Sequence, residues 1–106
     1  MRYRRRKVDA NQAEIVAALR AAGCSVVDLS AVGDGCPDLL VGRGFQNFLL
    51  EVKQPGEKIR KDKRGELQRR FHDEWRGQRS VVSTVNGALA AVLACEDLAN
   101  REVDLA

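Results

Sequence analysis

The sequence lacks several features that would assign it to a specialised class of protein. It has no apolar run long enough to cross a bilayer, which argues against a membrane protein. Its N-terminal segment is basic and leads into polar residues, so we expect no secretory signal and a cytosolic location. It also has no internal repeat, low-complexity segment or linker, and its 106 residues are enough for one compact domain.

Cysteine is scarce and irregularly spaced. The three cysteines, Cys24, Cys36 and Cys95, are odd in number and form no Cys-x-x-Cys pair. This pattern argues against a disulfide framework and against a zinc site. We expect the cysteines to act as small buried apolar residues.

Histidine and the aromatic residues are also few. Leu67, Phe71 and Trp75 lie four residues apart and predict the buried face of a helix. His72 is the only histidine, and we leave it out of the candidate site because a lone histidine is more often structural or exposed than catalytic.

The positive charge is small in total but concentrated. The net charge is +3, and basic residues cluster at 2–7, at 58–64 and at positions 69, 70, 76 and 79. The stretch after Ala88 carries acidic residues and a single arginine, Arg101. Such an asymmetry fits a phosphate-binding face opposite a neutral or acidic back, and it fits an ordinary solvated surface equally well.

Hydrophobic periodicity and turn residues predict seven elements. We expect helices over 9–22 and 66–76 and a third that starts near Asn86, and strands over 25–32, 38–41, 47–53 and 80–85. The order is therefore α-β-β-β-α-β-α. Short connections make the first three strands antiparallel neighbours, and the fourth returns past a helix. The sequence thus predicts an α/β (α+β) fold with a mixed sheet flanked by helices.

Polar residues near the predicted helix starts suggest caps. Asp9 with Gln12, or Asn11 with Glu14, can form a capping box on the first helix. Asn86 can cap the last helix.

Two charged residues interrupt the apolar strand over 47–53. Glu51 and Lys53 are two residues apart, so both side chains leave the same face of the strand, while Val52 points into the apolar layer. The turn at Gly42–Gly44 folds the preceding strand back alongside, which brings Asp38 towards Glu51. Asp38 and Glu51 can therefore converge at one end of the hairpin.

Two neighbouring carboxylates repel each other unless a cation or a proton lies between them. Mg²⁺ commonly takes one or two carboxylates together with substrate phosphate, and a lysine beside it can bind that phosphate or help to activate water. A surface salt bridge on an edge strand explains Glu51 and Lys53 on their own. The combination of Pro37-Asp38, a hairpin and Glu51-Val52-Lys53 is more specific.

These segments resemble the PD-(D/E)XK nuclease signature, and more closely the stand-alone VRR-NUC domains often found in bacteriophages. The matching segments are Gly35-x-Pro37-Asp38-Leu39, Leu50-Glu51-Val52-Lys53-x-Pro55-Gly56, and Gln68 within Leu67–Phe71. The resemblance covers about residues 8–95 of the chain. One departure is Gly65-Glu66, where the family often has Ser/Thr-Pro.

The resemblance implies a single VRR-NUC domain with a restriction-endonuclease-like core. It implies Mg²⁺, with Mn²⁺ as a substitute, held by Asp38, Glu51 and the Val52 carbonyl, and Lys53 as the catalytic lysine. It also implies phosphodiester hydrolysis in branched DNA, such as Holliday-junction resolution, by a homodimer in the cytoplasm of a bacterial or phage-infected cell.

Glu14 and Gln68 are two further candidates for the site, and each also has a purely structural explanation. Glu14 either reaches the metal from the first helix or belongs to the capping box with Asn11. Gln68 lies one position off the Leu67 stripe, where spacing alone favours an exposed polar residue. The family pattern favours contact with Lys53 or the nucleophilic water.

A basic loop follows the strand that carries Glu51 and Lys53. Phosphate contacts from such a loop would position DNA without reading its sequence. The candidate DNA-binding residues are Lys58, Arg60, Lys61, Lys63 and Arg64 in the loop, Arg69 on the next helix, and Arg5 and Arg6 as a second clamp.

The leading function is therefore a metal-dependent, structure-selective DNA endonuclease. A sequence-recognising restriction-like or nicking nuclease is an alternative, although the chain is short for a separate recognition domain. A DNA-binding module that has lost cleavage is another. The intact Asp38, Glu51 and Lys53 argue against a pure binder, which has no use for clustered carboxylates near phosphates.

Overall fold

Four strands form one mixed sheet. The computed structural model describes residues 2–57 and 61–93, with side chains from Ala10 onward. The strands are β1 (Ser25–Asp28), β2 (Leu39–Arg43), β3 (Gln46–Val52) and β4 (Arg79–Val82), in the order β1-β2-β3-β4. The first three are antiparallel neighbours and β4 pairs with β3 in parallel, as the sequence predicts.

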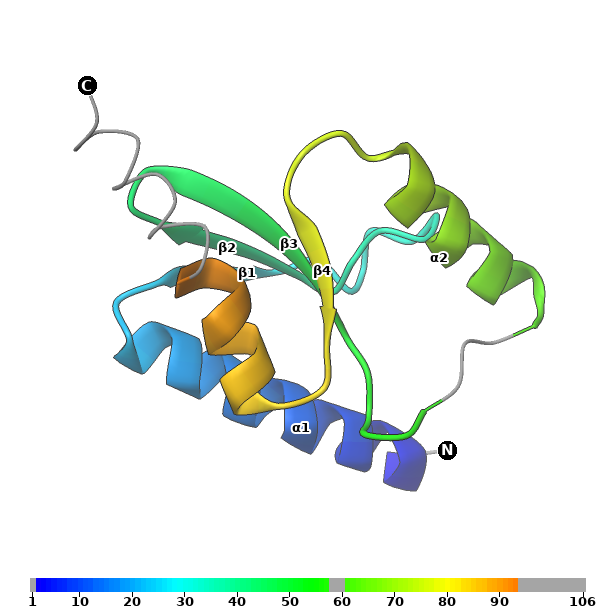
Figure 1. Ribbon diagram of the computed structural model, residues 1–106. Helices are drawn as coiled ribbons and strands as arrows, with labels where there is room; N and C mark the ends of the chain where they lie inside the picture. The colour runs from blue at the N-terminus through cyan, green and yellow to red at the C-terminus, as the bar shows by residue number, and fades with distance from the viewer. Residues whose placement is uncertain (1, 58–60, 94–106) are drawn as a thin grey trace.

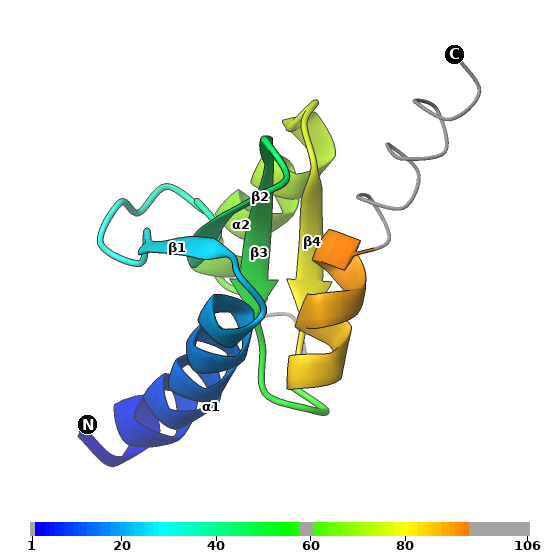
Figure 2. The same cartoon turned by 90° about the vertical axis from the view of Figure 1, so that its left-hand side faces the viewer.

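Helices lie on both faces of this sheet. They are α1 (Arg2–Ala21), α2 (Lys63–Glu74) and a third helix over 85–93. The order α-β-β-β-α-β-α and the α+β class are therefore confirmed. Figures 1 and 2 show α1 and the 85–93 helix on one side of the sheet and α2 on the other. No helix in the described part of the chain has both the length and the hydropathy that a membrane span requires.

A tight turn joins β2 to β3 and fixes their register. Gly44 and Phe45 have φ values of 58° and 63°, and the flanking Arg43 and Gln46 are paired. Positive φ at both central residues is typical of a type I′ turn, whose twist matches that of the strands. The same register pairs Leu39 with Leu50 at the far end of the hairpin.

One face of the sheet packs into the main core. Leu50 and Val52 of β3 are buried against Ile15 and Leu19 of α1 and against Val92 of the 85–93 helix. Leu50 and Val52 are two residues apart, so they share a face, as expected from strand alternation. Burial of this apolar layer fixes which face of β3 is turned towards α2.

The opposite face of β3 carries Leu49 and Glu51, and it is only partly covered by α2. Both side chains are buried, whereas Val81, which pairs with Glu51 from β4, is 58% exposed. The α2 face of the sheet is therefore open near the C-terminal ends of β3 and β4, where the candidate residues lie.

The helix starts differ from those predicted. Because α1 begins at Arg2, Asp9 and Asn11 lie inside the helix and neither capping box forms at its start. The third helix is capped by Thr84, whose Oγ1 accepts a hydrogen bond of 2.9 Å from the backbone amide of Gly87, and not by Asn86.

Two other expectations were wrong. The first strand ends at Asp28, because its Oδ1 accepts hydrogen bonds from the amide and the hydroxyl of Ser30 and turns the chain. Trp75 is 45% exposed rather than in the core, and its ring stacks on Phe71 with the centroids 5.2 Å apart. Cys24 is buried as expected, while Cys36 is half-buried and Cys95 lies outside the described residues.

Candidate active site

The hairpin brings Asp38 to the end of β3. Asp38 directly precedes Leu39, which pairs with Leu50, so Asp38 lies across from Glu51. The Oδ2 atom of Asp38 accepts a hydrogen bond of 2.8 Å from the backbone amide of Val52. The convergence of Asp38 and Glu51 expected from the sequence is therefore present.

Glu51 is a buried acid with one unpartnered oxygen. Its side chain is 3% exposed, and its Oε1 has no hydrogen-bond partner among the described residues. Burial, a hydrogen bond with the Asp38 carboxyl and the charge of Asp38 raise the pKa of Glu51 to about 8, against the opposing effect of Lys53. A proton on Glu51 thus relieves the repulsion between the two carboxyls.

The thiol of Cys36 is affected by the same two carboxyl groups. Burial raises the pKa of its thiol, and the charges of Glu51 and Asp38 raise it further. The thiol therefore stays protonated at neutral pH. Both carboxyl groups thus face one small region at the end of the hairpin.

Lys53 follows on the same face of the chain and is held from two sides. Its Nζ donates a hydrogen bond of 3.1 Å to Oε1 of Gln68 and lies 3.5 Å from Oε2 of Glu57. Its backbone carbonyl accepts a hydrogen bond of 3.2 Å from Nδ2 of Asn11 on α1. The Lys53 ammonium is therefore positioned beside the carboxyl pair, and the predicted contact between Gln68 and Lys53 is present.

The start of α2 places Gln68 opposite Lys53. Asp62 caps the helix, its Oδ1 accepting a hydrogen bond of 3.1 Å from the amide of Gly65. Gly35, with a φ of 79°, packs so closely on the helix that a Cβ there would lie 2.3 Å from the Leu67 carbonyl oxygen. Only glycine allows the loop before Asp38 to approach α2 this closely.

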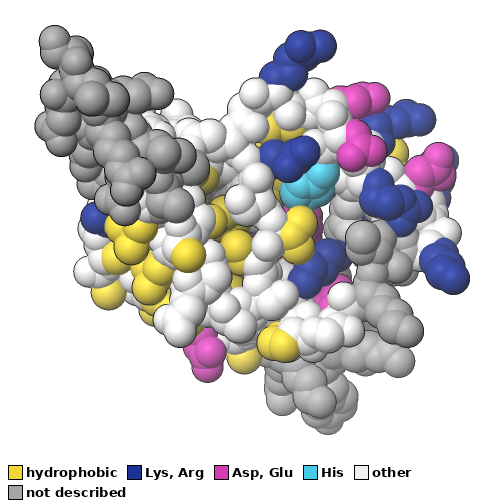
Figure 3. Space-filling view, in the orientation of Figure 1, with side chains coloured by type: hydrophobic (Ala, Val, Ile, Leu, Met, Phe, Trp, Pro, Cys, Tyr) yellow, Lys and Arg dark blue, Asp and Glu magenta, His cyan; other side chains and the backbone are white. Residues whose placement is uncertain are grey.

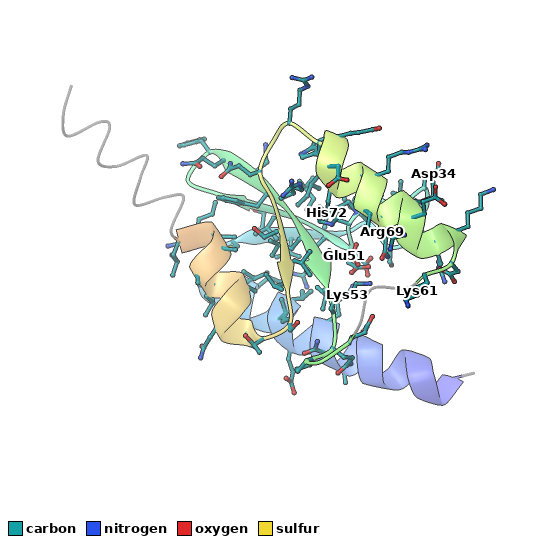
Figure 4. The ribbon with its side chains drawn as sticks, turned by 45° about the vertical axis from the view of Figure 1, so that its right-hand side comes forward. Asp34, Glu51, Lys53, Lys61, Arg69 and His72 are labelled. Carbon is teal, nitrogen blue, oxygen red and sulfur yellow. The ribbon has the colours of Figure 1, made fainter. Side chains whose placement is uncertain are left out.

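A cleft lies between α2 and the open face of the sheet. Its volume is about 360 Å³, and Glu51, Lys53 and Val81 line it on the sheet side. Gln68 and His72 line it from α2. Figure 4 shows Glu51 and Lys53 on the sheet side of this space, with Arg69 and His72 on the helix across from them. Glu51 and Lys53 therefore both border this cleft, whereas Asp38 lies behind Glu51 and is not among the residues that line it.

The donor set fits a hard divalent cation. Asp38 and the unpartnered Oε1 of Glu51 supply two carboxylates, and the Val52 carbonyl belongs to the residue between Glu51 and Lys53. Within 2–57 and 61–93, no group of three or more His, Cys, Asp and Glu side chains could hold a metal. Mg²⁺ does not need one, because it commonly binds one or two carboxylates and keeps several waters.

Glu14 has no contact that joins it to this arrangement among the described residues. It is exposed on α1, one helical turn after Asn11. Among the described residues, no hydrogen bond joins it to Asp38 or Glu51. Its predicted role as a metal ligand stays a prediction.

The described members of the predicted DNA-binding set are exposed on α2 or just before it. Figure 3 shows Lys and Arg side chains on the α2 side of the molecule, with the histidine among them. The exposed residues from the predicted DNA-binding set are Lys61, Lys63, Arg64 and Arg69. Lys58 and Arg60 lie outside the described residues, as do the side chains of Arg5 and Arg6. Lys63, Arg64 and Arg69 therefore lie on α2, the helix that borders the cleft, and Lys61 lies just before it.

Three contributors to the site were not predicted. Asn11 and Glu57 both contact Lys53, and His72 lines the cleft. His72 follows Gln68 by four residues on α2, a helical spacing that could have indicated it, whereas Glu57 lies in a turn where this spacing carries no such signal. The Asn11 contact joins residues 42 positions apart, and no local pattern indicates it.

Similarity to known proteins offers no guide to the activity. Comparisons with protein-family models, with curated proteins and with solved structures find no match to this chain. The function is therefore inferred from the chemistry of the site.

Proposed function

We propose that the protein is a metal-dependent endonuclease that hydrolyses phosphodiester bonds in DNA, of the VRR-NUC type that its motifs resemble. The observation that carries the proposal is the pair formed by Glu51 and Asp38. Glu51 is a buried acid with an unpartnered oxygen, and it lies against a second carboxyl group beside a held lysine. Burial of two neighbouring carboxyl groups destabilises the fold, so a purely structural role does not explain the pair.

The ligands for Mg²⁺, or for Mn²⁺ in its place, are the carboxylates of Asp38 and Glu51 and the carbonyl of Val52. Bound there, the ion supplies Lewis-acid stabilisation of a phosphate oxygen and lowers the pKa of a coordinated water. Glu51 gives up its proton when it becomes a ligand, since metal ligands bind in their deprotonated form.

Lys53 supplies the positive charge that the reaction needs next to the phosphate. Its ammonium binds a non-bridging oxygen of the scissile phosphate and stabilises the negative charge that develops in the transition state. Gln68 holds Nζ from α2 through the 3.1 Å hydrogen bond, so the ammonium is oriented before the substrate arrives.

The basic side chains around the cleft support DNA as the substrate. Lys61, Lys63 and Arg64 are exposed at the start of α2, next to the cleft wall formed by Gln68 and Arg69. Contacts from these residues bind the phosphate backbone without reading the sequence. We also propose that branched DNA is the preferred substrate and that the active form is a homodimer. The two active sites of a dimer would cut the two opposed strands of a junction.

The test is cleavage of four labelled substrates in Mg²⁺ or Mn²⁺: a four-way junction, a flap, a single strand and a plain duplex. Wild-type protein is compared with Asp38→Asn and Lys53→Met, purified in parallel, and binding to each substrate is measured in EDTA. We expect metal-dependent cleavage by the wild type alone, with binding retained by Asp38→Asn and weakened in Lys53→Met, which loses one phosphate contact.

Each result on this panel separates the alternatives. Paired symmetric nicks in the junction alone support a dimeric resolvase. Cutting of a duplex at one short sequence supports a restriction-like enzyme. Binding of all four substrates without cleavage contradicts the nuclease proposal and leaves a DNA-binding module.

A further inference from the structure

The proposed reaction gives no role to His72. The ring of His72 lines the cleft, and its Nε2 is buried with no hydrogen-bond partner among the described residues. A buried polar nitrogen without a partner destabilises the fold. Because His72 lines the cleft, a hydrogen-bond acceptor bound there can supply the missing partner.

The position of His72 relates it directly to Lys53. His72 follows Gln68 by four residues on α2, so the two side chains lie on one face, roughly one turn or about 5 Å apart. Gln68 holds the Lys53 ammonium at 3.1 Å. The imidazole is therefore about one helical turn beyond the group that binds the scissile phosphate in the proposed function.

Charges of both signs lie near the imidazole. The pKa of His72 is lowered by burial and then by Arg79 of β4, raised by Asp73, and lowered least by Lys53. The Arg79 side chain also donates a hydrogen bond to the His72 carbonyl, which fixes that cation beside α2. Arg69 lines the same cleft. An anion near the imidazole would therefore have Arg79 and Lys53 close by, although Asp73, Glu57 and Glu51 give the same cleft acidic groups.

We propose that His72 is a substrate-binding residue: its imidazole donates a hydrogen bond from a ring nitrogen to an oxygen of the phosphate next to the scissile one on the bound strand. This inference rests on the proposed function, because it takes the phosphate beside Lys53 as its reference. The orphaned ring nitrogen supplies the donor, and Lys53 and Arg79 supply the positive potential for a second phosphate.

Bound phosphate has a measurable effect on the ring. An anion at hydrogen-bonding distance stabilises the imidazolium form and opposes the effect of Lys53 and Arg79. The pKa of His72 is therefore expected to rise on binding, from below 6.5 in the free protein. Since His72 is the only histidine of the chain, its ring signals are assigned without mutagenesis.

The experiment is NMR of the imidazole with a short DNA oligonucleotide, in EDTA so that the strand stays intact. Ring proton and nitrogen shifts are followed across pH, free and bound. Binding is then measured for His72→Leu, which removes the donor, and His72→Gln, which keeps a side-chain N–H. Arg70→Ala is the matched control, an exposed basic residue of α2 that does not line the cleft.

We expect the ring signals to shift and their pKa to rise on binding. We also expect His72→Leu to weaken binding on the order of tenfold and His72→Gln to restore most of it. If DNA binds and is cut while the ring signals stay unchanged, the inference is overturned and the proposed function stands. If His72→Leu and His72→Gln lose binding equally, the donor is not the reason and the inference also fails. If the wild type neither binds nor cuts DNA, the proposed function itself falls, and this inference with it.

Discussion

The Oδ2 atom of Asp38 lies 2.8 Å from the backbone nitrogen of Val52 and accepts its hydrogen bond. This contact ties the residue before β2 to the last residue of β3, where it fixes the Asp38 carboxyl beside Glu51. The spacing of the two acids is therefore set by the backbone of the hairpin.

The first prediction concerns the pH dependence of stability without metal. The pKa of Glu51 is raised from 4.5 to about 8 in the fold, so the folded protein binds more protons than the unfolded chain between these values. The free energy of unfolding should therefore fall as pH rises from about 4.5 to about 8. Glu51→Gln, which cannot ionise, should be more stable at pH 8 by on the order of 1–2 kcal/mol.

Chemical denaturation in EDTA across this pH range measures both effects. Glu57→Gln is the control, because Glu57 is exposed, pairs with Lys53, accepts a hydrogen bond from the Gln54 amide, and has the smallest effect on the pKa of Glu51. If the free energy of unfolding depends on pH equally in Glu51→Gln and in the wild type, Glu51 is already ionised in the fold and the prediction is wrong.

The second prediction concerns protons released by the metal. At pH 7 Glu51 carries a proton, and a carboxylate must lose it to bind Mg²⁺. Calorimetric titration in two buffers of different ionisation enthalpy should show a release approaching one proton per ion. Saturating Mg²⁺ should also stabilise the fold, by about 2.7 kcal/mol at a hundred times the Kd. Asp38→Asn should lose both signals, and heats that do not depend on the buffer would contradict the account.

The third prediction separates Lys53 from Gln68 and Glu57. Lys53→Met should abolish cleavage, because its ammonium stabilises the transition state. Gln68→Ala should lower kcat about 10- to 100-fold with little change in KM, since Gln68 orients the ammonium at 3.1 Å without binding the substrate. Glu57→Gln should stay within a few-fold of the wild type. Steady-state kinetics on a labelled junction test this ranking, and a loss confined to KM in Gln68→Ala would assign it to substrate binding instead.

The fourth prediction concerns the turn between β2 and β3. Phe45 is fully exposed with a φ of 63°, a conformation that costs a residue with a Cβ about 1–2 kcal/mol. Phe45→Gly should therefore stabilise the fold by roughly 0.5–1 kcal/mol in denaturant unfolding. Cleavage should be unchanged, because the turn lies at the opposite end of β3 from Glu51. A loss of activity in this variant would give Phe45 a role in binding that the turn does not explain.

The sheet and the acid pair could be predicted from the sequence because the signals for them are local. The alternation of Leu50, Glu51, Val52 and Lys53 fixes the faces of β3, and a short turn fixes the partner strand. Asp38 and Glu51 come together whenever the two strands of the hairpin pair in the correct register. The burial of Leu50 and Val52 fixes that register.

Contacts between distant elements were harder to predict. The extra turns of α1 before Asp9 come from a basic segment without an apolar stripe, so periodicity did not include them. Because α1 begins earlier than predicted, Asn11 lies inside the helix, where its side chain donates a hydrogen bond to the Lys53 carbonyl and caps nothing. The exposure of Trp75 depends on how far α2 covers the sheet, which the spacing of Leu67, Phe71 and Trp75 does not encode.

The central claim is that the Glu51 and Asp38 carboxyls form a metal site for phosphodiester hydrolysis. Its most direct test is the rate of Mg²⁺-dependent cleavage of a four-way junction by Glu51→Gln against the wild type, with thermal stability measured on the same samples. Glu51→Gln should be at least as stable as the wild type and cleave at least about a thousandfold more slowly. Cleavage at the wild-type rate by this stable variant would contradict the account.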